Sequence, residues 1–253
     1  MKRLSLALKI AALPATPLER ALLFAWSGAA ALRLPLSPLR VRIRFPGGAH
    51  AISFKAIADV WVLKDVLLDR EYDHPYPGAP EVIVDLGANI GISTAYFAAR
   101  FPGAIVHAVE PNPHLARQLA ENLAGFGNVR VHHFALGAGD GRASLSLGAS
   151  SAASSIVARV GANAVSVETV SFATLFARIG SERIDILKFD IEGAERYLFE
   201  RPAPRPVGAY VGEIHYDKMP LVRDDICAAL AGYAIEEYPA GRDDRALIYA
   251  QKE

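Results

Sequence analysis

The chain from about residue 80 onward alternates two hydrophobic patterns. Short runs rich in β-branched and aliphatic residues, typical of buried strands, are followed by longer segments with helical spacing of the apolar positions. The predicted strands are 81–87, 104–111, 129–136, 184–190 and 209–216, and the predicted helices are 92–102, 113–127, 172–180, 193–200 and 221–233. This alternation predicts a mostly parallel sheet with helices on both faces. A short segment at 165–171 is expected at the edge.

The last two apolar runs, 234–239 and 246–252, are joined only by the polar turn 240–245. A connection this short cannot hold a crossover helix, so the two runs should pair as antiparallel strands. The predicted fold is therefore an α/β, doubly wound, mostly parallel seven-stranded sheet that ends in an antiparallel hairpin. Ligands of such sheets bind beyond the carboxyl ends of the strands.

Residues 1–78 form a predicted region of their own in front of the sheet domain, 79–253. The expected elements of this region are helices over 1–35 and 58–69 and a hairpin of 41–45 with 50–57. Its apolar run 21–32 is too short to cross a bilayer alone. We expect packed helices that cap a substrate pocket or form a dimer contact. A membrane-surface contact is the alternative, supported by the basic residues Arg33, Arg40, Arg42 and Arg44.

Composition narrows the classes of protein to which the chain can belong. The chain has 253 residues, 52% of them hydrophobic, which is enough for a packed core and argues against disorder. Its 27 basic and 27 acidic residues cancel, so no broad basic surface for nucleic acid is expected. The single cysteine, Cys227, excludes an intrachain disulfide and favours a cytoplasmic location.

The first predicted strand ends in a glycine loop that carries Asp85, Gly87, Asn89 and Gly91. Gly87 allows a tight turn, and the helix that follows offers free N–H groups. The glycines are spaced G-x-x-x-G rather than G-x-G-x-x-G, which argues against a nicotinamide dinucleotide. Glu110 ends the second strand, where a carboxylate can accept from both hydroxyls of a ribose. Together the loop and Glu110 predict a nucleoside site.

Three motifs follow one another here: "VDLGANIG" at 84–91, "AVEP" at 108–111 and "KFDIEGAE" at 188–195. In this order they resemble the FkbM-type methyltransferases, which belong to the class I superfamily that uses S-adenosylmethionine and has a Rossmann-like fold. The resemblance covers 58–216 well and 1–50 poorly. It implies that Asp85, Gly87, Asn89 and Gly91 surround the methionine part, Glu110 holds the ribose, and Ala135 and Leu136 lie along the adenine.

Charged residues crowd the end of the fourth strand. The eight-residue segment 188–195 contains Lys188, Asp190, Glu192 and Glu195, with Gly193 among them. Unpaired charges cannot face a dry core, so these side chains must pair or line a site. Lys188 is interpreted as the ion partner of a nearby acid, and Glu195 as an acid in a first helical turn.

The fifth strand ends with Glu213 and His215, which should converge with Asp190 and Glu192 because the two strands are neighbours. We expect catalysis by Asp190, His215 and Glu192, with His215 as the preferred base, and acceptor binding by Glu192, Glu213 and His215. A divalent cation held by Asp190, Glu192, Glu213 and His215 is the alternative that we do not favour, since such clusters also hold substrates and lysines.

The resemblance implies methylation of a hydroxyl oxygen on a small molecule, natural product or sugar. The acidic cluster would also suit a cationic amine, so N-methylation of an amine or peptide is the alternative within the enzyme class. A non-catalytic nucleoside-binding module is the alternative outside it, against which the intact acidic residues argue. The expected partners are a small-molecule or glycan acceptor and no nucleic acid, with a homo-oligomer left open.

Overall fold

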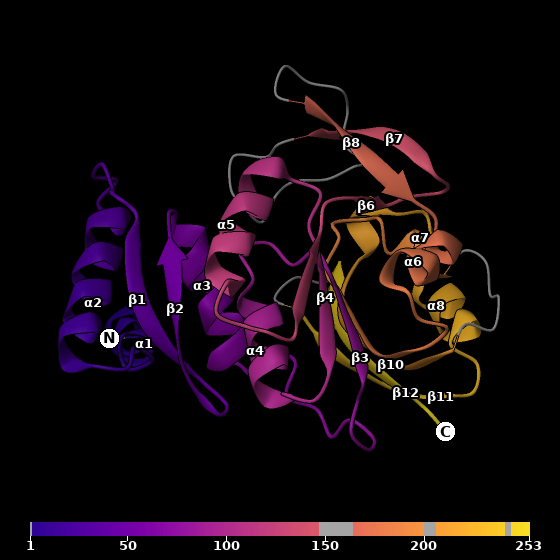
Figure 1. Cartoon of the computed structure of the whole chain (residues 1–253), viewed down its shortest axis with the longest axis horizontal. Coiled ribbons are helices and arrows are strands. Elements are labelled where there is room, and N and C mark those ends of the chain that lie inside the picture. The colour runs from indigo at the N-terminus through magenta and orange to yellow at the C-terminus, as the bar shows by residue number, and fades with distance from the viewer. Residues whose placement is uncertain (1, 147–163, 200–205, 241–243) are drawn as a thin grey trace.

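The computed structural model describes residues 2–146, 164–199, 206–240 and 244–253. A seven-stranded sheet lies at its centre, with the order β11–β12–β10–β9–β3–β4–β5 (Figure 1). The strands are β3 (Val82–Leu86), β4 (Ile105–Val109), β5 (Val129–His132), β9 (Ile184–Phe189), β10 (Val207–His215), β11 (Tyr233–Pro239) and β12 (Arg245–Lys252). Neighbours from β5 to β10 are parallel, whereas β12 pairs antiparallel with both β10 and β11. The predicted fold class is confirmed.

Helices cover both faces of this sheet. One face carries α4 (Ile92–Arg100) and α5 (Pro113–Leu123), and the other carries α6 (Phe172–Ile179), α7 (Arg196–Phe199) and α8 (Arg223–Ala229) (Figure 1). Successive strand residues point to opposite faces. Ile83 therefore packs in the core of α4 and α5 with Phe97 and Leu119, while Val84 packs in the core of α6 to α8 with Leu175. The candidate site lies at the carboxyl ends of the strands, between this sheet and the end of α3.

The N-terminal region consists of α1 (Lys2–Ala11), α2 (Pro17–Ala31), the hairpin β1 (Leu39–Phe45) and β2 (Gly48–Phe54), and α3 (Ile57–Leu67). It packs beside α4 and α5 (Figure 1). Its buried Phe54 and Leu63 belong to the same hydrophobic core as Phe97 and Leu119. In the described parts of the chain, every helix is too short or too polar to cross a bilayer. The boundary between 78 and 79 remains a prediction.

One predicted strand, 129–136, is divided in two. Its first part is β5 in the main sheet, whereas Ala135–Leu136 form β6 of a second sheet with β7 (Gly141–Ser146) and β8 (Ala164–Val170), in the order β6–β8–β7. The expected edge segment at 165–171 is thus a strand of this second sheet. His133 lies at the break, where its Nδ1 is 3.0 Å from the carbonyl oxygen of Glu110. The small-residue segment 148–155, whose Ser154 and Ser155 are candidate polar contacts for a bound cofactor by sequence, lies outside the described residues.

Candidate active site

A cavity of about 520 Å³ opens at the carboxyl ends of β3, β4, β9 and β10. Five of the residues expected to bind the cofactor line this cavity near β3 and β4. They are Gly87, Asn89, Glu110, Ala135 and Leu136. Asp190, Glu192 and Glu213 line the same cavity from β9 and β10. The cavity therefore joins the predicted nucleoside site to the acidic residues.

The glycine loop is tied to the neighbouring strand by the backbone. The N–H groups of Gly87 and Ala88 both donate to the carbonyl oxygen of Val109, at 3.0 Å. Gly87 has φ +77°, and a Cβ there would lie 2.0 Å from the carbonyl oxygen of Asp190. Only glycine fits a turn this close to a second backbone. The loop thereby places the nucleoside side of the cavity directly against Asp190.

Asp85 and Gly91 do not line the cavity. The Asp85 carboxylate accepts from the hydroxyls of Ser93 at 2.7 Å and Thr94 at 2.6 Å, and it is fully buried. A Cβ on Gly91 would lie 2.8 Å from Leu119, so this glycine lets the loop pack on α5. The reason is local: Asp85 still belongs to the strand, and its side chain points toward the start of α4 rather than beyond the sheet. Asp85 and Gly91 therefore support the glycine loop on the side that faces α4 and α5, away from the cavity.

Glu110 joins the two turns that border the nucleoside side. Its carboxylate accepts from the backbone N–H of Asn89 at 2.9 Å and from that of Asn112 at 2.8 Å. Burial raises the pKa of Glu110 to about 7, although these two hydrogen bonds act in the opposite direction. Each carboxylate oxygen keeps a lone pair beyond these bonds, so the group can still accept from two hydroxyls.

Lys188 is buried at the end of β9 and confirms the expectation that it pairs with a nearby acid. Its Nζ lies 2.9 Å from Asp85 and donates to the carbonyl oxygen of Gly87 at 2.9 Å. Burial alone lowers the pKa of Lys188, but the charges of Asp85 and Asp190 outweigh it and raise the pKa. Lys188 therefore stays charged, and its hydrogen bond to the Gly87 carbonyl oxygen stabilises the glycine loop.

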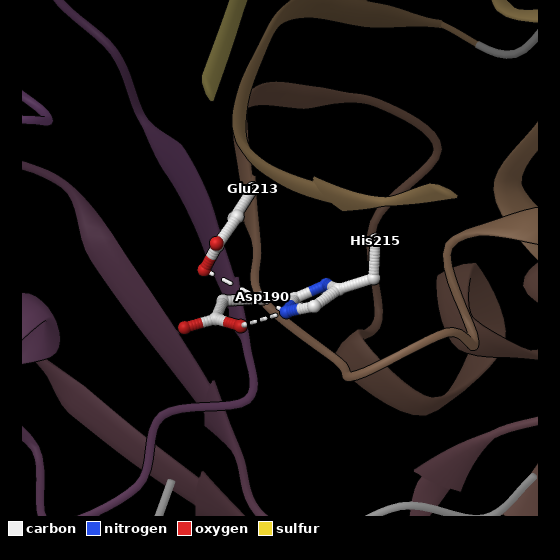
Figure 2. Close-up of side chains that lie close together, drawn as sticks. All are labelled: Asp190, Glu213 and His215. Atoms are coloured by element: carbon white, nitrogen blue, oxygen red, sulfur yellow. Dashed lines mark ion pairs between the residues drawn. The ribbon is translucent and has the colours of Figure 1, made fainter. Parts of the chain in front are cut away.

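The imidazole ring of His215 points toward the acidic side chains, as Figure 2 shows for Asp190 and Glu213. Its Nε2 lies 3.5 Å from Glu192, 3.6 Å from Glu213 and 3.9 Å from Asp190. The predicted convergence of these four side chains is thus present in the structure. His215 itself is fully buried and lies behind the cavity wall, not on it.

Glu195 holds His215 in place, a role that the sequence does not indicate. Its carboxylate lies 2.9 Å from His215 Nδ1 and also accepts from the N–H groups of Ile191 and Gly193. The sequence predicts Glu195 inside a helix of 193–200, but α7 begins only at Arg196. An acid just before a helix looks like a favourable end charge, and nothing local shows that its side chain turns inward to a histidine twenty residues away.

The surroundings of His215 argue against its role as base. Burial lowers the pKa of His215, but the hydrogen bond to Glu195 and the charges of Glu195, Asp190 and Glu213 together raise it above its ordinary value. A raised pKa does not itself exclude a base, but His215 is fully buried and does not line the cavity, so it cannot contact an acceptor directly. Asp190 is better placed, because its side chain is 37% exposed and lines the cavity.

The opposite wall of the cavity comes from the N-terminal region and was not anticipated from the sequence. It includes Asp65, Asp69 and Glu71, at the end of α3 and just after it. Burial, together with the charges of Asp65, Asp190 and Glu213, raises the pKa of Glu71 to about 8. The signal available in the sequence was the i, i+4 pair of acids at 65 and 69, which places both on one helix face.

Comparison with known proteins identifies the family of this chain. The family profile described as "Methyltransferase FkbM domain" matches residues 85–240, more than half of the chain. The chain belongs to the FkbM methyltransferase family. The match includes the glycine loop, Glu110 and all residues around His215, so the sequence resemblance is confirmed. The chain is accordingly a methyltransferase.

Two curated proteins match this FkbM-family chain over shorter stretches. Methyltransferase sdnD of Sordaria araneosa is 34% identical over 79 residues, which is 30% of this chain and 30% of that protein. The AMB antimetabolite synthetase AmbE of Pseudomonas aeruginosa is 29% identical over 102 residues, which is 40% of this chain and 5% of the synthetase. Each match therefore spans less than a third of the relative's own length.

Among solved structures, the fibrillarin pre-rRNA processing protein of Methanococcus jannaschii has a TM-score of 0.52 and 14% sequence identity to this FkbM-family chain. The alignment covers 85% of this chain and 89% of that one. At this identity the similarity shows a shared fold alone.

FkbM methyltransferases use S-adenosylmethionine, whose sulfonium supplies an electrophilic methyl group. The cavity of this member fits such a molecule. The close turn at Gly87 leaves backbone accessible, and the buried Oδ1 of Asn89 has no hydrogen-bond partner among the described residues. Glu110 offers its remaining lone pairs, while Ala135 and Leu136 present an apolar surface. The donor set thus combines an amide and a carboxylate with an apolar face, as a nucleoside with an amino-acid tail requires.

Proposed function

We propose that the chain transfers a methyl group from S-adenosylmethionine to a hydroxyl oxygen of a small molecule, natural product or sugar. The observation that carries this proposal is the position of Asp190. The backbone carbonyl oxygen of Asp190 packs against Gly87 of the glycine loop, and the Asp190 side chain lines the cavity that this loop borders. A carboxylate beside the methyl donor can bind an acceptor hydroxyl and hold it in line with the sulfonium.

The chemistry is one displacement. The acceptor oxygen forms a bond to the methyl carbon, the bond from that carbon to sulfur breaks, and S-adenosylhomocysteine leaves. The hydroxyl proton passes to the Asp190 carboxylate. Glu192 and Glu213 contact the acceptor in this proposal, and His215 acts behind them as a positioning residue. Gly87 and Asn89 face the methionine part, Glu110 the ribose, and Ala135 with Leu136 the adenine.

N-methylation is the second candidate, and the opposite wall favours it. Asp65 and Asp69, which pair with Lys64, face the cavity together with Asp190 and Glu213, so an ammonium group would meet several acidic side chains. Acidic side chains outnumber the basic Lys64, Lys188 and Arg245 in the cavity lining, which disfavours an acceptor rich in phosphates. A cytoplasmic location, a dimer contact and a membrane contact of the N-terminal region remain predictions, and vesicle flotation of the full chain tests the last of them.

Thermal shift tests the cofactor, with S-adenosylhomocysteine compared with NAD and ATP. We expect a rise in melting temperature with S-adenosylhomocysteine alone, and a shift with NAD alone would contradict the proposal. Methyl transfer from labelled S-adenosylmethionine to pools of polyols or amines then separates oxygen from nitrogen acceptors. Asp190→Asn should lower turnover about 100-fold or more while S-adenosylhomocysteine still binds. Full turnover in Asp190→Asn would exclude the proposed role.

A further inference from the structure

We infer that Asp190, Glu213 and His215 form a binding site for a divalent metal ion. One ligand atom from each side chain, a carboxylate oxygen or an imidazole nitrogen, lies within 4.8 Å of the other two (Figure 2). They come from the end of β9 and from alternate positions on β10, which are parallel neighbours in the sheet. Atoms bound to one ion at about 2.1 Å lie roughly 3–4 Å apart. Small side-chain movements would therefore complete the coordination.

The independent observation is the Nε2 atom of His215. The side chain is fully buried, and Nε2 has no hydrogen-bond partner among the described residues although it points between carboxylates. Buried polar atoms without partners are rare and require an explanation. A metal ion between Nε2, Asp190 and Glu213 supplies one, because it accepts the nitrogen lone pair and both carboxylates at once.

The other nitrogen of the ring is already held as metal-binding histidines require. Nδ1 lies 2.9 Å from the Glu195 carboxylate, so an Nδ1–H donates there and the Nε2 lone pair is left free to bind an ion. Carboxylate–histidine–metal arrangements of this kind orient the ring and make the nitrogen more basic. Glu195 is itself fixed by the N–H groups of Ile191 and Gly193. The turn between β9 and α7 therefore fixes Glu195, and Glu195 in turn orients the His215 ring for metal binding.

Charge supports the same site. Glu192 pairs with Lys218, and Glu213 lies 3.4 Å from Arg245. Asp190, by contrast, has only the His215 contact at 3.9 Å among the ion pairs of the described residues. A divalent cation would bring Asp190 and Glu213 a common counter-charge. Two carboxylate oxygens and one imidazole nitrogen suit an ion of intermediate hardness such as Mn²⁺.

This inference deepens the proposed function and rests on it for its catalytic meaning. Three protein ligands leave coordination positions open, and Asp190 and Glu213 line the acceptor side of the cavity. An acceptor hydroxyl bound to the ion would be oriented and would have a lowered pKa. The Asp190 oxygen nearest His215 is Oδ1, so Oδ2 can still take the hydroxyl proton. An acceptor with two neighbouring oxygens would bind best, because it can chelate the ion.

Metal binding is tested without any acceptor. The full chain is dialysed against EDTA, and Mn²⁺ is titrated with detection of free Mn²⁺ by electron paramagnetic resonance, with and without S-adenosylhomocysteine. We expect about one Mn²⁺ per chain, and about tenfold weaker binding or worse in Asp190→Asn, Glu213→Gln and His215→Gln. Glu182→Gln removes an exposed carboxylate far from the cavity and should bind Mn²⁺ as the wild type does.

Two results would overturn the inference: no Mn²⁺ binding in either condition, or equal binding by wild type, Asp190→Asn and Glu213→Gln. If Glu213→Gln or His215→Gln does not fold, Asp190→Asn decides, because Asp190 is a partly exposed residue of the cavity surface. Binding of S-adenosylhomocysteine without Mn²⁺ binding would reject the metal site and leave the proposed function standing. Mn²⁺ binding without S-adenosylhomocysteine binding would reject the proposed function instead.

Discussion

The carboxyl group of Glu110 illustrates how much a single residue depends on its surroundings. The sequence places it at a strand end, where a ribose contact is expected, and the structure adds that it is buried between two backbone N–H donors. Its pKa is raised from 4.5 to about 7. Since the folded pKa is the higher one, the contribution of Glu110 to stability is present below pH 4.5 and lost as the pH rises through 7.

Cofactor affinity should show the opposite pH dependence. Ribose hydroxyls donate to the ionised carboxylate, so protonation of Glu110 below pH 7 weakens binding. We expect the affinity for S-adenosylhomocysteine to rise about tenfold from pH 6 to pH 8, measured by calorimetry. Glu110→Gln has no charge to titrate and should give weaker, pH-independent affinity. A flat profile for the wild type would contradict the ribose role.

Among the elements, the β3–α4 loop is the one whose geometry follows most directly from its sequence. Its glycine at 87 has φ +77° and packs on the backbone of Asp190, so the loop and the end of β9 are mutually dependent. The strand of 129–136 is the opposite case. Its apolar pattern is continuous, yet the chain leaves the main sheet at His133, because β8 offers β6 a partner that only the folded chain brings near.

Gly87→Ala should disturb both sides of the cavity. The added Cβ would lie 2.0 Å from the Asp190 carbonyl oxygen, and alanine is strained at φ +77°. We expect a loss of about 2–4 kcal/mol in the free energy of unfolding, measured by urea denaturation, and loss of S-adenosylhomocysteine binding. Gly103→Ala is the control, because a Cβ there meets no atom within 4 Å. Normal cofactor binding by Gly87→Ala would refute the assigned loop geometry.

In the whole molecule, the N-terminal region and the sheet domain share one core and one buried hydrogen-bond network. Asn122 on α5 accepts from the N–H of Ser53 at 2.8 Å and donates to the carbonyl oxygen of Ile90 at 2.8 Å. It thereby joins the hairpin of β1 and β2 to the glycine loop. The acidic wall at Asp65 and Glu71 is carried by the same region, so the shape of the acceptor side depends on this packing.

Asn122→Ala tests the connection. It leaves the Ser53 N–H and the Ile90 carbonyl without their buried partner, so we expect about 2–4 kcal/mol of destabilisation. Urea denaturation should still show one transition if both parts unfold together. Glu121→Ala, at the adjacent exposed position, should change stability by less than about 0.5 kcal/mol. Two separate transitions in the wild type would show that the parts fold independently.

The sequence by itself determined the order of the helices and of the strands in the main sheet, the closing hairpin, the glycine loop and the acids at neighbouring strand ends. These features follow from local periodicity and from the rule that parallel strands end at one edge of the sheet. Only the tertiary structure decided that Glu195 holds His215, that Asp85 supports the loop from behind, and that α3 supplies an acidic wall. Each of these depends on where a side chain points after distant segments have packed, and local patterns carry no information about that.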